Sequence, residues 1–167
     1  MGEARPAFEK YWPGTRDGIT NKAMRTADRI RLIAPCGMDC AICSGYLAFS
    51  HGVPKRRGAI THCLGCRARN KRCAWLKQHC GRLGEGGYTY CHECPDFPCA
   101  HLQHLDERYR ASYGMSMVEN LELIRRSGTA AFIRAQQSRW GCPRCGGLRS
   151  VHNGRCFACD VVRHWRS

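Results

Sequence analysis

The sequence has few of the large apolar residues from which most domains build a core. Leucine, isoleucine, valine and phenylalanine together supply only 27 of the 167 residues. Acidic residues are also scarce, with 13 Asp and Glu against 27 Lys and Arg, and the formal net charge is +14. Such a composition favours disorder, because too little apolar surface is buried to offset the conformational entropy of the chain. It excludes a large barrel or a doubly wound enzyme.

Long hydrophobic runs and export signals are missing as well. The longest stretch without Asp, Glu, Lys or Arg is residues 40–54, which is too short and too polar to cross a membrane. Residues 1–18 lack the apolar segment of a secretory signal, so we expect a cytoplasmic protein without membrane contact. In the reducing cytosol, closely spaced thiols indicate metal ligands, although the even number of cysteines also suits a disulfide framework.

Cysteine is abundant, with 14 residues, and four of them have the C-x2-C-x10-C-x2-C spacing of a zinc ribbon: Cys142, Cys145, Cys156 and Cys159. Each C-x2-C pair turns the chain so that both thiolates face one tetrahedral ion. Asn153-Gly154 between the two pairs fits the centre of a type I′ hairpin turn. Four thiolates leave no open coordination position, so we predict a structural zinc ion, which contributes on the order of 10 kcal/mol to the folding of a small domain.

The other ten cysteines fall into three clusters: Cys36, Cys40 and Cys43; Cys63, Cys66, Cys73 and Cys80; and Cys91, Cys94 and Cys99. We interpret the middle cluster as one metal site and the two outer clusters as a shared second site. A mononuclear site takes four thiolates, and ten is not a multiple of four. Either two thiols are spare, or some of the cysteines form a binuclear cluster, and both interpretations remain open. We therefore expect two or three zinc ions in the protein, with an iron–sulfur cluster as the alternative, since thiolates bind both metals.

Two alternatives for the upstream cysteines fit less well. The Cys36-x3-Cys40-x2-Cys43 spacing occurs in radical S-adenosylmethionine enzymes, but no strand–helix alternation follows Cys43. The Cys63-x2-Cys66-x6-Cys73 spacing, with its basic loop, is similar to half of a fungal binuclear zinc cluster, but the second half departs from that pattern. We predict no catalytic residues, although an unligated cysteine beside a histidine could act as a nucleophile.

Three upstream motifs occur in a characteristic order: Cys36-Gly-Met-Asp-Cys40-Ala-Ile-Cys43, Cys63-Leu-Gly-Cys66-Arg and Cys91-His-Glu-Cys94-Pro-Asp-Phe-Pro-Cys99. Together they resemble the Cys-rich family of bacteria and archaea known as domain of unknown function 3795, over residues 36 to about 105. The resemblance implies metal binding, with zinc as the expected ion. The family has no established activity, so the resemblance implies no particular reaction. The sequence departs from the family pattern at Ser44, where proline is expected after the third cysteine.

The positive charge comes mainly from arginine and is concentrated near two cysteine motifs. Eight residues are candidate phosphate contacts: Arg67, Arg69, Lys71, Arg72, Arg149, Arg155, Arg163 and Arg166. The last four alternate with Phe157 and Trp165, and such a surface suits nucleic acid because phosphates attract the charge and bases stack on rings. An arginine-rich solvated surface is the alternative. We expect a binding module for nucleic acid or a protein partner, with no small-molecule substrate indicated.

The pattern of apolar residues predicts few helices. A short helix is expected within residues 21–30, a second starts near Asp96, and Ser116 with Glu119 forms a capping box for a third that stops at Gly128. A last helix covers residues 130–139. We predict a small metal-stabilised α+β fold with an N-terminal extension (1–35), a Cys-rich metal-binding domain (36–112), a helical segment (113–140) and a zinc ribbon (141–167).

Overall fold

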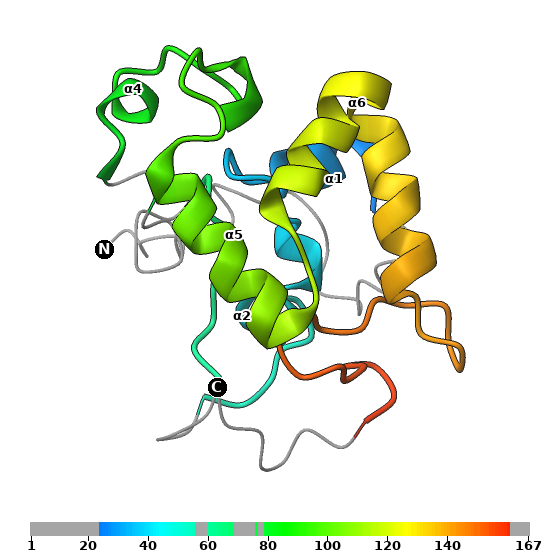
Figure 1. Cartoon of the computed structure of the whole chain (residues 1–167). Helices are drawn as coiled ribbons and strands as arrows, with labels where there is room; N and C mark the ends of the chain where they lie inside the picture. The colour runs from blue at the N-terminus through cyan, green and yellow to red at the C-terminus, as the bar shows by residue number, and fades with distance from the viewer. Residues whose placement is uncertain (1–23, 56–59, 69–75, 77–78, 161–167) are drawn as a thin grey trace, which may run out of the picture.

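A computed structural model describes residues 24–55, 60–68, 76 and 79–160, which form mainly short helices (Figure 1). In chain order these are α1 (Thr26–Arg31), the 3-10 helix η2 (Cys40–Ile42), α2 (Ser44–Ser50), α4 (Gly81–Gly84), the 3-10 helix η4 (Cys91–Glu93), α5 (Ala100–Tyr113) and α6 (Met117–Trp140). Within the described residues no extended strand forms. Isolated antiparallel bridges join Ile33 to Asp39, Gly141 to Leu148 and Arg149 to Cys156. The tail thus contains only two single bridges, and neither the ribbon hairpin nor the β part of the predicted α+β fold is seen in the described residues.

Helix α1 and the residues that follow it lie between the two longest helices, α5 and α6 (Figure 1). Figure 1 shows α1 and the segment after it between α5 and the second half of α6. The predicted start of α5 near Asp96 is wrong, because residues 94–97 form a turn in which the Phe97 N–H donates to the Cys94 carbonyl (3.1 Å). The helix begins instead at Ala100 and ends at Tyr113, and Gly114 caps it with a left-handed φ of 60°. α5 therefore starts directly after a cysteine motif.

The junction between α5 and α6 is fixed by Ser116. Its hydroxyl oxygen accepts a hydrogen bond from the Glu119 N–H (3.0 Å), as the capping box predicts. The Glu119 carboxylate, however, pairs with Arg110 (2.9 Å) instead of returning to the helix start. The Ser116 hydroxyl also donates to Asp106 on α5 (2.7 Å), so one carboxylate ties the two helices together.

The predicted stop at Gly128 is present as a sharp bend inside α6. Gly128 has φ 78° and ψ 167°, which lies outside the helical region, and the two halves of α6 run in different directions (Figure 1). The bend lets both halves contribute to the core, through Met117, Leu121 and Ile124 before it and Phe132 and Ile133 after it.

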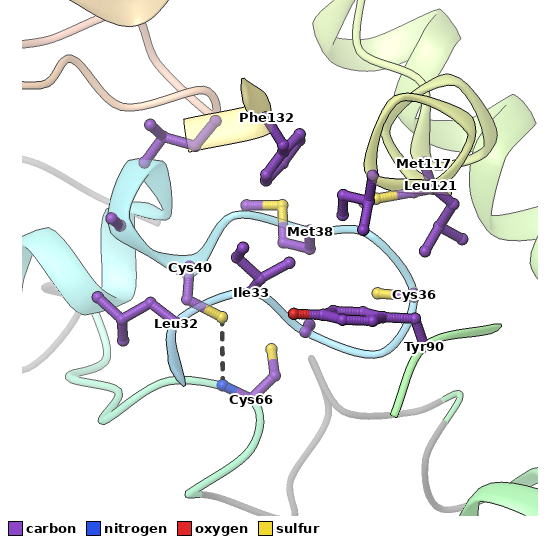
Figure 2. Close-up of a cluster of buried hydrophobic side chains, with 14 of the residues drawn as sticks. Leu32, Ile33, Cys36, Met38, Cys40, Cys66, Tyr90, Met117, Leu121 and Phe132 are labelled. Atoms are coloured by element: carbon purple, nitrogen blue, oxygen red, sulfur yellow. Dashed lines mark hydrogen bonds between the residues drawn. The ribbon is translucent and has the colours of Figure 1, made fainter. Parts of the chain in front are cut away.

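The scarce apolar residues are concentrated in one main buried cluster. Ile33, Leu121 and Phe132 are buried there (Figure 2). Ile42 and Leu102 are buried in the same cluster. Four buried cysteines belong to the same cluster: Cys36, Cys40, Cys66 and Cys91. Leu148 and Val151 of the tail join it too. Thiol side chains therefore occupy core positions that aliphatic residues fill in most domains.

In the described part of the chain, no helix is long and apolar enough to span a membrane.

Candidate metal centre

Two tight turns in the tail position the C-terminal quartet, which comprises Cys142, Cys145, Cys156 and Cys159. In the first turn, the Gly146 N–H donates to the Cys142 carbonyl (2.8 Å), and Gly146 takes a left-handed φ of 72° that favours glycine. In the second, the Asp160 N–H donates to the Cys156 carbonyl (2.9 Å), while the Asp160 carboxylate accepts from the Cys156 N–H (3.0 Å). The type I′ turn predicted at Asn153-Gly154 is wrong, because Gly154 has a positive φ (68°) but Asn153 does not. Residues 150–154 form a wider turn instead, closed by the Gly154 N–H donating to the Ser150 carbonyl (2.8 Å).

The four sulfur atoms of this quartet meet at one point. All lie within 4.8 Å of one another, with 4.0 Å between Cys142 and Cys159 and 3.6 Å between Cys145 and Cys156. A tetrahedral zinc ion with Zn–S bonds of about 2.3 Å holds its sulfur ligands about 3.8 Å apart. Both cross-pair distances agree with that value. The geometry therefore fits a single tetrahedral metal ion bound by four thiolates.

The surroundings of the quartet act differently on its members. The Arg144 and Cys145 N–H groups donate to the Cys142 sulfur and lower the pKa of that thiol to about 6. Interaction with Cys145 and burial raise the pKa of the Cys159 thiol to about 12. Four thiolates this close together repel one another unless a cation lies between them. A divalent ion that replaces the protons of the four thiols compensates this repulsion.

The upstream cysteines divide into two groups that differ from the predicted pairing. Cys40 and Cys66 lie together, since the Cys66 N–H donates to the Cys40 sulfur (3.2 Å; Figure 2). Cys63 and Cys43 flank Gly45, because a Cβ added at Gly45 would lie 3.2 Å from the Cys63 Cβ and 3.9 Å from the Cys43 sulfur. The first C-x2-C pair, Cys40 and Cys43, therefore faces the second, Cys63 and Cys66.

Cys80 belongs to the other group. It lines a pocket together with Cys91, Cys94 and Cys99. Burial and then the nearby thiols of Cys36, Cys99, Cys80 and Cys94 raise the pKa of Cys91. The expectation that Cys80 shares a site with Cys63 and Cys66 is therefore wrong. The sequence could not show this, because residues 81–90 return Cys80 to the third cysteine cluster. Cys73 lies outside the described residues, and none of the thirteen described cysteines is in a disulfide.

Arg67 and the tail aromatic residue Phe157 have structural roles that the sequence did not indicate. Arg67 is half-buried and donates to the carbonyls of Ile33 (2.6 Å) and Thr89 (2.9 Å), with its guanidinium over the Tyr90 ring. Phe157 is only 5% exposed and lies against His51, so its ring is not available to stack on a base. Of the other candidate phosphate contacts, Arg149 is half-buried and Arg155 is exposed. The remaining five lie outside the described residues: Arg69, Lys71, Arg72, Arg163 and Arg166.

His152 is a structurally important residue that sequence reasoning missed. Its Nδ1 accepts from the Ser44 N–H (3.2 Å), and its ring packs edge-on against Tyr113, with 4.9 Å between ring centroids. The neighbouring Val151 N–H donates to the Ile42 carbonyl (2.9 Å). These contacts hold the tail on the Cys-rich segment. No local motif signals them, since Ser44 and Ile42 lie more than 100 residues before their tail partners and Tyr113 is also distant in the sequence.

The described chain is thus a Cys-rich, largely helical protein with a candidate metal centre of four cysteines. Residues 32–104 match the model of a family described as protein of unknown function (DUF3795). The match confirms the resemblance predicted from the cysteine motifs, and the C-terminal quartet lies beyond the matched segment. A search of curated proteins and a search of solved structures find no match.

Proposed function

We propose that the protein is a zinc-stabilised binding module in which the C-terminal quartet holds one structural zinc ion. The observation that carries this proposal is the convergence of four thiols within 4.8 Å. Four protein ligands complete a tetrahedral shell and leave no position for a substrate or an activated water. The ion then serves to fold residues 142–159 into a ribbon-like unit.

Zinc binding in the tail also affects the rest of the protein. Leu148 and Val151, which lie between the two halves of the quartet, are 6% and 5% exposed and pack in the main core. The tail has few other apolar residues, so the metal holds the loop that delivers these two side chains. Loss of the ion is expected to release the tail and expose the surface of the Cys-rich segment beneath it.

The expected partner is a nucleic acid. Support comes from the formal charge of +14 and from exposed arginines on α6, among them Arg125, Arg126 and Arg134. A zinc ion with four thiolates carries a net charge of about −2, so even three such sites leave the protein basic. Phosphates bind such a surface with release of counterions.

Binding to labelled single- and double-stranded nucleic acid at several salt concentrations tests the partner. The proposal predicts an affinity above that of a charge-matched control protein and a steep fall with salt. Replacing Arg126 and Arg134 by alanine removes two candidate phosphate contacts. The slope of log K against log[salt] is then expected to become shallower by about two. Affinity equal to that of the control protein contradicts the nucleic-acid part, while zinc analysis of the same sample tests the metal part separately.

A further inference from the structure

A second cysteine-lined site lies more than forty residues upstream of the tail quartet. It is a small pocket of about 20 Å³ between α4, η4 and the start of α5. Cys80 precedes α4, Cys91 opens η4, Cys94 ends it, and Cys99 precedes α5. The two ends of η4 and the residues that precede α4 and α5 therefore each bring one cysteine to the same cavity.

The backbone around these four thiols is well ordered by hydrogen bonds. The Cys80 N–H donates to the Leu76 carbonyl (2.9 Å), and the Cys94 N–H donates to the Cys91 carbonyl (3.1 Å). The Cys99 carbonyl accepts from the Gln103 N–H in the first turn of α5 (2.9 Å). The Cys91 N–H donates to the Pro35 carbonyl (2.9 Å), which anchors the pocket to the main core.

The remaining walls are almost wholly apolar. Leu76, Leu83 and Leu102 line the pocket and are 4%, 8% and 0% exposed. The charged lining residues, Arg82 and Asp96, are more than half exposed and pair with each other (3.0 Å). A polar metabolite would therefore find few hydrogen-bonding partners inside the pocket. Sulfur is the chemical group that the pocket offers to a ligand, which selects a thiophilic metal centre.

The spacing of the sulfur atoms separates this site from the tail quartet. In the tail, four sulfurs lie within 4.8 Å of one another, as one zinc ion requires. In the described part of the chain, no second set of three or more ligand atoms is that compact. No three of the pocket thiols therefore have the spacing that a single zinc ion requires. A cubane iron–sulfur cluster accepts more widely spaced thiolates, because each thiolate binds a different iron at the cluster's outer corners.

We propose that Cys80, Cys91, Cys94 and Cys99 bind a [4Fe–4S] cluster in this pocket. The apolar walls shield the cluster from water, which is the role of the hydrophobic shell around many metal sites. The site is separate from the zinc site, and the inference does not depend on the proposed function of the tail.

Anaerobic purification of the full chain from iron-supplied cells, or reconstitution with iron and sulfide, tests the inference. Iron, acid-labile sulfide and zinc are measured in the same sample, together with visible absorption and electron paramagnetic resonance after reduction. We expect about four irons and four sulfides per chain and a broad visible absorption that bleaches on reduction. A colourless protein in which zinc fills the upstream cysteines after both treatments overturns the proposal.

Three single variants identify the ligands. Cys94→Ser and Cys99→Ser are expected to lower iron and sulfide at least about tenfold while the tail retains its zinc. Cys145→Ser is the matched control, expected to lose zinc and keep the iron. Retention of iron and sulfide in both pocket variants contradicts the ligand set. If the pocket variants fail to fold, the iron and sulfide content of the wild-type chain and of Cys145→Ser still decides between a cluster and zinc.

Discussion

Arg29 and Asp39 form a buried ion pair at the base of the Cys-rich segment. The Arg29 Nη2 lies 2.8 Å from the Asp39 Oδ2, and the two side chains are 3% and 0% exposed. Asp39 also accepts from the Ala41 N–H (3.0 Å), at the start of the turn that carries Cys40. Burial raises the pKa of the Asp39 carboxyl, and the charge of Arg29 opposes that shift. The pair therefore connects α1 to the first cysteine motif.

Removal of Arg29 is expected to leave an unpaired charge in the core. Arg29→Met should lower the free energy of unfolding by about 3–5 kcal/mol, because a buried carboxylate loses its counterion. Denaturation with urea measures the change. Arg25→Met, which removes an exposed partner of Asp28, is the matched control and should have little effect. Equal effects of the two substitutions would show that the buried pair has no special importance.

Gly37 allows the first cysteine motif to pack against α6. Its φ is +85°, and a Cβ at this position would lie 2.7 Å from the Met117 carbonyl oxygen and 2.9 Å from the Leu121 Cγ. Gly52 also has a positive φ, of +61°, but an added Cβ there meets no atom within 4 Å.

The two glycines therefore form a controlled comparison. Gly52→Ala should cost about 1–2 kcal/mol, since it introduces only backbone strain. Gly37→Ala should cost more, by roughly 1–3 kcal/mol, because the methyl group also displaces α6. Thermal unfolding of the two variants measures the difference. Equal losses in stability would contradict the close contact between Gly37 and Met117.

Asp106 predicts a specific dependence of stability on acid. Burial raises the pKa of its carboxyl, but hydrogen bonds from Ser116, the Val118 N–H and Arg110 outweigh burial and lower it below 3.8. A lowered carboxyl pKa contributes stability that is present above the unfolded value and is lost as pH falls through the folded value.

Asp106→Asn should therefore lower stability at pH 7 by roughly 1–3 kcal/mol, because buried donors lose a charged acceptor. Below pH 4 the variant should lose less additional stability than the wild type. Unfolding by urea between pH 7 and pH 2.5 measures both curves. Parallel curves over the acidic range would show that Asp106 does not contribute to the pH dependence.

His152 predicts a second effect of pH, on the attachment of the tail. Burial lowers the pKa of its imidazole below 6.5, so the folded tail favours the neutral ring. Stability from this group is present above pH 6.5 and is lost as pH falls through the folded pKa. The protection factor of the Val151 amide, which corrects for the pH dependence of intrinsic exchange, should fall on acidification while zinc stays bound. His152→Gln should reduce this pH dependence, and an unchanged dependence would exclude His152 as its cause.

The sequence predicted the parts of this protein that depend on local spacing. The tail quartet, the Ser116 cap and the bend at Gly128 each follow from residues within one turn or one hairpin, where the spacing alone fixes the geometry. The family match over residues 32–104 agrees with the cysteine motifs for the same reason.

Features set by distant contacts were not predictable. Cys80 lies with Cys91, Cys94 and Cys99 because of the path of residues 81–90, and cysteine spacing does not encode that path. Arg67 was expected at a phosphate-binding surface, yet it donates to two carbonyls inside the fold. The sequence shows an arginine in a basic loop, but it does not show whether the guanidinium contacts solvent or the backbone.

The most direct test of the account is the zinc content of the protein together with its unfolding, before and after chelation under reducing conditions. We predict that the C-terminal quartet binds one zinc ion, and that Cys156→Ser lowers the zinc content by one equivalent. Removal of this ion should abolish protection of the Val151 amide and the cooperative melting of the tail. A chain that binds no zinc at Cys142, Cys145, Cys156 and Cys159, or that melts identically after complete removal of metal, would contradict the account.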